Sequence, residues 1–145
     1  MNRIEEHYIQ LLDAEPVAIE SLLARKNSEW AQGGVYLVLD KNLTHLYVGE
    51  SADNMYGRIK IQVTTPINSD IYNLFWNEWA QPQYANHFKT RHSFKMLPVN
   101  DGYLRMALEM YVFYTLRPVI NHDGLSGIEM QWQAKRTAYL QSIEI

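Results

Sequence analysis

The chain has 145 residues, of which 47% are hydrophobic and 20% charged, and its formal net charge is −3. This composition is typical of one globular domain with a sizeable core, and the net charge argues against a general nucleic-acid binder. Cysteine is absent, which excludes disulfides, thiolate zinc sites and a cysteine nucleophile. No apolar run approaches the ~20 residues of a membrane span, and residues 1–10 do not resemble a secretory signal. A cytoplasmic protein without a membrane partner is therefore expected.

The N-terminal residues predict helices. Apolar side chains recur at helical spacing from the start of the chain, at Ile4, Tyr8, Leu11 and Leu12. Pro16 suits the first turn of a second helix, with Ile19, Leu22 and Leu23 on one face. We expect residues 1–33 to form a helical extension packed on the rest of a single domain.

A β-hairpin is predicted next. Residues 35–39 and 45–48 are apolar and aromatic runs, and the segment 40–44 between them is polar. So short a loop makes the strands antiparallel, which lets Tyr36 and Tyr47 approach one another. Gly34 and Gly49 would allow the backbone to come close to a neighbouring group or a ligand. On residue type alone, two tyrosines that fill a sheet face are the commoner interpretation.

Helices and one more strand follow the hairpin. Asp53 or Asn54 can cap a helix that carries Arg58 and ends at Pro66, and residues 68–86 are aromatic-rich and predicted to be helical. Residues 91–99 predict a third strand.

The last part of the chain predicts two more helices. One begins at Asp101 and runs to Leu116, where Pro118 terminates it, and residues 128–143 predict a terminal helix. The expected fold is a single α/β (α+β) domain over residues 1–145, with a small three-stranded antiparallel sheet flanked by helices. Its core would span residues 34–121, and residues 122–145 would add a C-terminal helix.

Five sequence elements occur in a fixed order. Gly34-Val35-Tyr36 and Tyr47-Val48-Gly49 lie on the predicted hairpin, and Arg58, Glu109 and the pair Pro118 and Asn121 follow. This order resembles the GIY-YIG nuclease superfamily, which places two such triplets on a hairpin, an arginine on the next helix and a glutamate on a later one. In one element the chain departs from the family, because Gln62 stands where the family usually has a histidine or tyrosine one turn after the arginine.

The resemblance implies catalytic roles for Tyr36, Tyr47, Arg58 and Glu109. Glu109 would bind Mg²⁺ (or Mn²⁺), because a carboxylate in an apolar segment needs a cation and these ions prefer oxygen ligands. Arg58 would hold a phosphate oxygen. Tyr36 would be the general base, helped by nearby positive charge that lowers a phenol pKa, with Tyr47 as a supporting hydrogen bonder. The alternative for Glu109 is an ion pair with Arg105, four residues earlier on the same helix face.

Two further residues are expected to support the site. Asn121 would brace it by bonding backbone groups after the helix. Gln62 can donate and accept hydrogen bonds but cannot relay a proton. His45 or His122 would have to reach the site to relay it.

The substrate class follows from the resemblance and from local charge. Residues 58–117 hold seven basic and four acidic side chains, and a nucleic-acid contact is assigned to Lys60, Lys89, Arg91 and Lys95. A mixed, solvated surface explains the same charges equally well. The first hypothesis is a divalent-metal-dependent endonuclease that hydrolyses phosphodiester bonds of DNA, with specificity from the added segments, a homodimer or a separate partner. The second is a catalytically impaired module that binds nucleic acid or protein.

Overall fold

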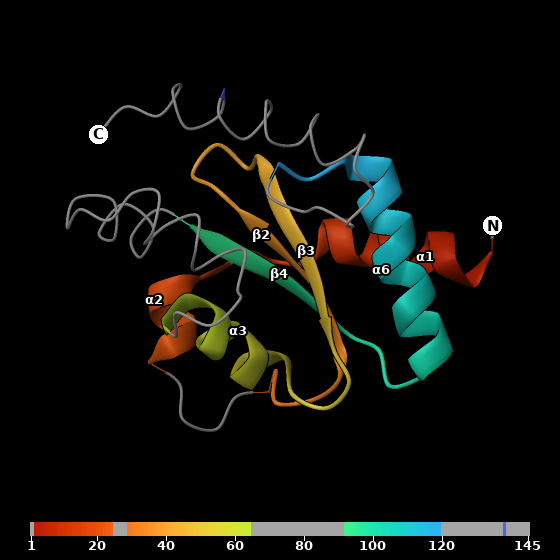
Figure 1. The fold of residues 1–145 in the computed structure, drawn as a ribbon, viewed down its shortest axis with the longest axis horizontal. Coiled ribbons are helices and arrows are strands. Elements are labelled where there is room, and N and C mark those ends of the chain that lie inside the picture. Colours follow the sequence, from red (N-terminus) through yellow and green to blue (C-terminus); the bar gives the residue numbers. More distant parts are fainter. Residues whose placement is uncertain (1, 25–28, 65–91, 120–137, 139–145) are drawn as a thin grey trace.

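The structure, a computed structural model, describes residues 2–24, 29–64, 92–119 and 138. Its helices and strands are α1 (Arg3–Asp13), β1 (Val17–Ala18), α2 (Ile19–Leu23), β2 (Gly34–Leu39), β3 (His45–Ser51), α3 (Met55–Thr64), β4 (Ser93–Pro98) and α6 (Gly102–Leu116). The strands form one antiparallel sheet in the order β1-β4-β2-β3 (Figure 1). The predicted α+β class is therefore confirmed, with four strands instead of three.

The additional strand is β1, where a helix start was predicted. Val17 and Ala18 pair with Phe94 and Ser93 of β4, and the helix that Pro16 was expected to open begins only at Ile19. The backbone N–H of Ile19 donates to the carbonyl of His92, which continues the attachment to β4. A strand of two residues is too short to produce a periodic pattern, so the sequence gives no local signal for it.

Helices cover both faces of the sheet. In Figure 1, α1 and α6 lie together on one face, and α2 and α3 lie on the other. The central strand β2 is buried along its whole length, and its side chains pack alternately into two separate cores, one on each face of the sheet. Tyr36 and Val38 belong to the core under α2 and α3, whereas Val35, Leu37 and Leu39 belong to the core under α1 and α6.

The predicted hairpin is confirmed, and Asp40 shapes its turn. One oxygen of Asp40, Oδ1, accepts the backbone N–H groups of Asn42 and Thr44, each at 2.9 Å. Leu43 adopts a left-handed backbone conformation with φ 62°. The resulting register places Tyr36 opposite Gly49 and Val38 opposite Tyr47.

Side-chain caps fix where two functional helices begin. Asn54 Oδ1 accepts the backbone N–H of Gly57 at 2.9 Å in the first turn of α3. Asp101 Oδ1 accepts the N–H groups of Tyr103 and Leu104 at 3.0 and 3.1 Å at the start of α6. Both helix starts were predicted from these capping residues. The helices predicted over 68–86 and 128–143 lie outside the described residues, Ala138 excepted.

Of the helices in the described part of the chain, none has both the length and the apolar character needed to cross a membrane.

Candidate active site

Tyr36 extends from the central strand across the edge strand. Its cross-strand neighbour is Gly49, and a Cβ built on that glycine would lie 2.5 Å from both Cζ and the hydroxyl oxygen of Tyr36. Neighbouring strands are roughly 4.8 Å apart, so the Tyr36 side chain spans this distance and its hydroxyl lies over Gly49 of β3. Gly49 is thus needed for this position of the Tyr36 ring, since any side chain would displace it.

Tyr47 stands beside Tyr36 on the same sheet face. It is half-buried, opposite Val38, and its ring centroid lies 6.4 Å from that of Tyr36 with the ring planes tilted by 31°. The two tyrosines of the two triplets are therefore neighbours, as the hairpin predicted. Tyr36 is fully buried and Tyr47 only partly, so Tyr47 is the tyrosine with the more accessible side chain.

Arg58 reaches Tyr36 from α3. Its side chain is exposed, and its guanidinium makes a hydrogen bond to Tyr36 that lowers the pKa of the phenol. Arginine is charged at any pH of interest, so this contact places a permanent positive charge beside the tyrosine hydroxyl.

Glu109 approaches the same place from the other side of the sheet. It lies on α6, and its carboxylate interacts electrostatically with Tyr36 and with Arg58. Both α3 and α6 contact β3, the edge strand of the described sheet, from opposite faces. Side chains from the two helices therefore meet around the edge of β3. We call Tyr36, Tyr47, Arg58 and Glu109 the Tyr36 cluster.

Glu109 is half-buried and makes no hydrogen bond or ion pair with any described residue. Burial, the nearby charge of Glu50 and a smaller opposing effect of Arg58 together raise the pKa of Glu109 from 4.5 to about 7. Removing a carboxylate from water without a partner favours its neutral form, which accounts for the raised pKa. A cation bound beside Glu109 would favour its charged form instead.

The predicted alternative for Glu109, an ion pair with Arg105, is wrong. Arg105 is buried and its Nε donates to Glu50 Oε2 at 2.8 Å, while a second guanidinium nitrogen donates to the carbonyl of Val99 at 3.4 Å. Glu50 follows Gly49 and, by the alternation of a strand, its side chain points to the α6 face, opposite Val35. Tertiary contact with β3 therefore outweighs the local helix spacing.

Glu50 is the functional candidate that sequence reasoning missed. Two signals were available: it directly follows the second triplet, and strand alternation places it on the face opposite Tyr36, where a later helix would pack. The role of Glu50 depends on the packing of α6 beside β3, which the sequence does not show.

The oxygen donors of this region fit a hard divalent cation. Glu109 offers a half-buried carboxylate free of competing bonds among the described residues, and Glu50 is close enough to raise its pKa. In the described part of the chain, no group of three or more His, Cys, Asp or Glu side chains could enclose a metal. Mg²⁺ commonly binds to one or two carboxylates while keeping waters and substrate phosphate oxygens, so Glu109 is the residue of this region that could hold it.

The pKa of Tyr36 is raised well above 10, contrary to the expected lowering by a nearby positive charge. Burial is the largest cause and Tyr47 the next, and the lowering by Arg58 only partly offsets them. The expected effect of Arg58 is therefore present but outweighed. At neutral pH the Tyr36 hydroxyl keeps its proton and can donate a hydrogen bond.

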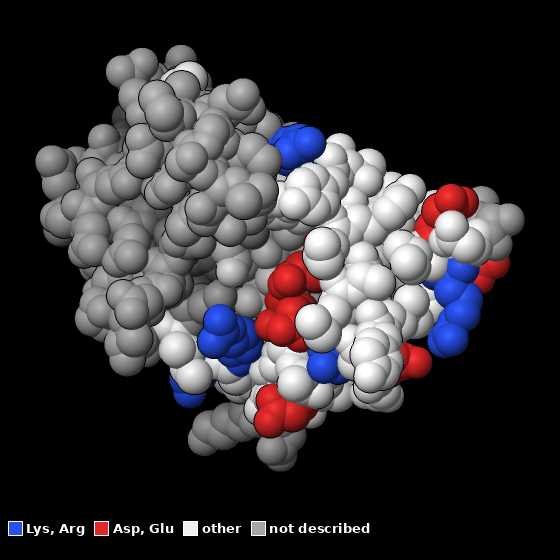
Figure 2. Space-filling view, turned by 45° about the vertical axis from the view of Figure 1, so that its right-hand side comes forward, with Lys and Arg blue, Asp and Glu red and all other residues white. Residues whose placement is uncertain are grey.

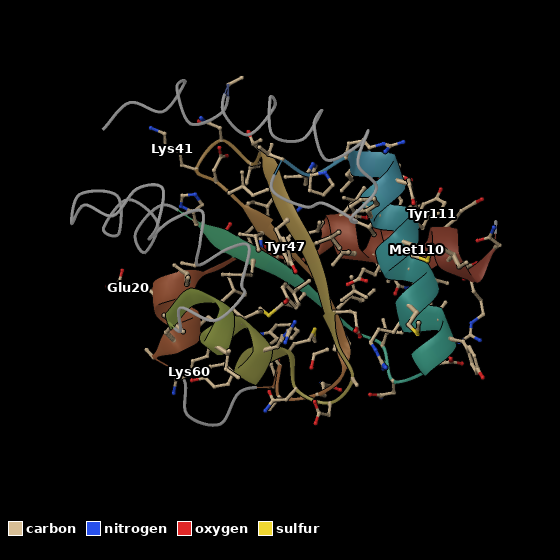
Figure 3. All side chains as sticks on the ribbon, viewed as in Figure 1. Glu20, Lys41, Tyr47, Lys60, Met110 and Tyr111 are labelled. Carbon is tan, nitrogen blue, oxygen red and sulfur yellow. The ribbon has the colours of Figure 1, made fainter. Side chains whose placement is uncertain are left out.

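The other predicted site residues are not all placed near this cluster. Lys60 is exposed on α3 and projects away from α6 (Figure 3). Lys95 lies on the α1 face of the sheet, where its ammonium donates to the carbonyl of Leu12. His45 is half-buried at the start of β3, and burial followed by the charge of Lys95 lowers its pKa. Gln62 lies within α3. The side chain of Gln62 and the predicted positions Lys89, Arg91, Asn121 and His122 lie outside what the structure describes.

Charge on the described surface is mixed. Figure 2, turned toward α6, shows acidic side chains beside basic ones, next to a broad uncharged area. The described part of this face does not present a continuous basic surface.

Comparison with known proteins gives no assignment: no protein-family model matches the chain, and neither does any curated protein.

Proposed function

We propose that the chain is a divalent-metal-dependent endonuclease that hydrolyses phosphodiester bonds of DNA, of the GIY-YIG type. The observation that carries the proposal is the Tyr36 cluster, in which four separate elements bring together two tyrosines, an exposed arginine and a carboxylate that has no bonded partner among the described residues. Phosphodiester hydrolysis needs a positioned water and stabilisation of the charge that develops on phosphate oxygens. These four side chains supply groups for both needs.

Each residue has a distinct role in this proposal. Glu109 would hold Mg²⁺ or Mn²⁺, with Glu50 beside it, and the bound cation would supply Lewis-acid stabilisation of the phosphate and leaving oxygens. Arg58 donates to a non-bridging phosphate oxygen, for which its exposed planar fork is suited. Arg58 would in this way hold the phosphate beside Tyr36 and Tyr47.

Tyr36 orients the attacking water through its hydroxyl. Arg58 donates to this hydroxyl oxygen, and a protonated phenol can itself donate one hydrogen bond. Because burial raises the pKa of Tyr36, a protonated phenol is the form present at neutral pH. Tyr47, which is less buried, supports the same water or the phosphate by a hydrogen bond.

The raised pKa of Tyr36 also favours the second candidate, a module that binds DNA without cleaving it. A phenol that keeps its proton is a poor general base at neutral pH. The mixed charge of the described surface suits neither candidate better than the other, because phosphate affinity depends on contacts outside these residues as well.

Supercoiled plasmid DNA tests the proposal. The full chain is incubated with the plasmid in Mg²⁺ or in Mn²⁺, with EDTA as the cation-free control, and nicked and linear products are quantified. We expect cleavage that needs the cation and is lost in Glu109→Gln, since the amide keeps the shape but removes the charge that holds the cation. Glu20→Gln is the matched control, because Glu20 is an exposed glutamate on α2, far from α6 (Figure 3).

The outcomes separate the two candidates. Cleavage by the wild type and Glu20→Gln but not by Glu109→Gln supports the endonuclease. Equal cleavage by Glu109→Gln excludes Glu109 as the cation ligand. Absence of cleavage by folded wild-type protein, with a mobility shift of the same DNA, supports the binding module.

A further inference from the structure

Helix α6 carries a stripe of exposed apolar and aromatic side chains. Its members are Tyr103, which is 90% exposed, Met106 at 59%, Met110 at 57% and Tyr114 at 44%. Successive residues of a helix are turned by about 100°, so these four side chains lie within an arc of about 80° on one face. We call these four residues the α6 stripe. Single exposed apolar residues are ordinary on a protein surface, whereas a continuous apolar patch marks an interaction site.

The α6 stripe contains no charged residue. The two charged residues of this helix lie on its other sides, because Arg105 is buried and bonded to Glu50 of β3, and Glu109 is half-buried. The broad uncharged area in Figure 2 is on the side of the molecule turned toward α6. Aromatic residues and methionine are enriched at the centre of protein interfaces, where charged residues are depleted. The stripe therefore has the composition of a protein-binding surface, and it lacks the basic groups that phosphate binding needs.

The order of residue types in the α6 stripe is the same from both ends. A tyrosine stands at each end and the two methionines lie between them. When a second α6 lies antiparallel on the stripe, Tyr103 faces Tyr114 of the second copy and Met106 faces Met110. The two-fold axis repeats both contacts, as a symmetric dimer requires when residue i contacts residue j and j contacts i. Antiparallel helices that cross at about 20° keep such contacts over several turns.

The charges at the two ends of α6 are complementary in the same arrangement. Asp101 is exposed at the start of the helix, and Arg117 is exposed directly after its end. Antiparallel pairing brings the Arg117 end of each copy to the Asp101 end of the other, whereas parallel pairing would bring like charges together. The helix dipoles favour the antiparallel direction as well.

The exposed area of the α6 stripe is large enough for a dimer. With roughly 200 Å² for a fully exposed side chain of this size, the four exposed fractions amount to about 500 Å² per copy. Two copies would bury about 1,000 Å² from these side chains alone, which reaches the lower limit for a specific interface before any flanking contact is counted.

We propose that the α6 stripe is the interface of a homodimer in which two copies pair antiparallel through α6. A second copy fits the stripe in its order of residues, in the charges at its ends and in its area. Helical spacing places Glu109 about 100° from Met110, so the interface does not use the Tyr36 cluster. The inference is accordingly independent of the proposed function.

Sedimentation of the full chain from micromolar to submillimolar concentration tests the proposal. We expect a monomer–dimer equilibrium with a Kd on the order of micromolar, as suits an interface at the small end of the range. Met106→Lys/Met110→Lys should raise the Kd by about 100-fold or more, since it replaces apolar contacts with like charges that face each other. Ile61→Lys is the matched control, because Ile61 is an exposed apolar residue on α3, and it should associate like the wild type.

A second double variant of opposite charge tests the antiparallel register. Met106→Glu/Met110→Glu should be as monomeric as the lysine variant when each is measured alone. In an equimolar mixture each lysine faces a glutamate, so the two variants should bind each other at least about tenfold more tightly than either binds itself. Equally weak association in the mixture overturns the pairing of the stripe with itself. All four substitutions are at exposed positions, and circular dichroism confirms that each variant is folded.

The remaining outcomes also overturn the proposal. A wild-type dimer that persists unchanged in both double variants has its interface elsewhere on the molecule. A wild type that stays monomeric at every concentration shows that the stripe does not pair with a second copy. If the lysine variant of such a monomer also has a lower Tm, the stripe is covered by another part of the same chain.

Discussion

Two regions near Gly49 differ in whether their charged side chains are bonded to a partner among the described residues. On the α6 face, the buried guanidinium of Arg105 is bonded to Glu50 and to a backbone carbonyl. In the Tyr36 cluster, Glu109 is half-buried and makes no such bond with a described residue, and the pKa values of Glu109 and Tyr36 are both raised. The paired charges stabilise the attachment of α6 to β3. The half-buried carboxylate of Glu109 costs stability when it is charged, and a cost of this kind is common at functional sites.

After Glu109→Gln, which should abolish cleavage, removing the hydroxyl of Tyr36 should have the largest effect in the cluster. Tyr36→Phe keeps the ring over Gly49 but removes the group that orients water, so we expect plasmid cleavage to fall by roughly 10²–10⁴-fold. The free energy of unfolding, measured by thermal denaturation, should change by no more than about 1 kcal/mol, since one hydrogen bond with Arg58 is lost. Tyr47→Phe, on the neighbouring strand, should have the smaller effect on cleavage. Equal rates for Tyr36→Phe and the wild type would exclude a role for the hydroxyl.

Arg58→Ala should lower cleavage by about 10²–10³-fold, the usual loss when one donor to developing charge is removed. The folded state should be nearly as stable as the wild type, because the Arg58 side chain is exposed. Lys60→Ala is the matched control, since it removes a positive charge two residues away on the same helix. Similar losses in both variants would mean that Arg58 contributes only general attraction to DNA.

The sequence predicts one of these two regions better than the other. The hairpin and the cap at Asp101 follow from local signals: alternation, polar turn residues and a capping side chain. These signals predict the hairpin, the start of α6 and the tyrosine pair correctly, because each of these features depends on residues close together in the chain. The assignment of Arg58 and Glu109 to the site came instead from the resemblance.

The paired region was not predictable in the same way. Helix spacing favoured Arg105 with Glu109, but Arg105 instead bonds to Glu50, 55 positions away. Likewise, a nearby arginine suggested a lowered pKa for Tyr36, whereas the depth of burial raises it. The first result depends on how α6 packs against β3, and the second depends on how α2 and α3 cover Tyr36. Local patterns in the sequence reveal neither packing. The two-residue strand β1 was missed for the related reason that only its pairing with β4 defines it.

A change in the paired region should affect stability more than a change in the cluster. Arg105→Met removes the partner of Glu50 and should lower the free energy of unfolding by about 2–3 kcal/mol, less than for a fully buried pair because Glu50 is 32% exposed. Urea unfolding monitored by circular dichroism measures the difference. A loss below about 0.5 kcal/mol would show that this ion pair behaves like an ordinary surface pair.

The smallest expected effect is a pH dependence that comes from Glu109. Its pKa is raised from 4.5 to about 7, so between these values the folded state binds the proton more tightly than the unfolded state. Stability from this group is therefore present below about pH 4.5 and is lost as the pH rises to about 7. Allowing for partial exposure, the loss is about 1–2 kcal/mol.

Unfolding curves at pH 5 and pH 8 measure this effect as the difference between the wild type and Glu109→Gln, which cancels the other titrating groups. The wild type should lose stability relative to the variant on going to pH 8. A constant difference between the two proteins would mean that Glu109 titrates normally and that its carboxylate is not held in an unfavourable environment.

The position of a bound cation tests the contrast between the two regions most directly. Crystals grown with Mn²⁺ and measured near the manganese absorption edge locate the ion by its anomalous scattering. We predict one strong peak about 2.0–2.3 Å from a carboxylate oxygen of Glu109. A peak elsewhere in the molecule, or none beside Glu109 in protein that cleaves DNA with Mn²⁺, would contradict the assignment of Glu109 as the cation ligand.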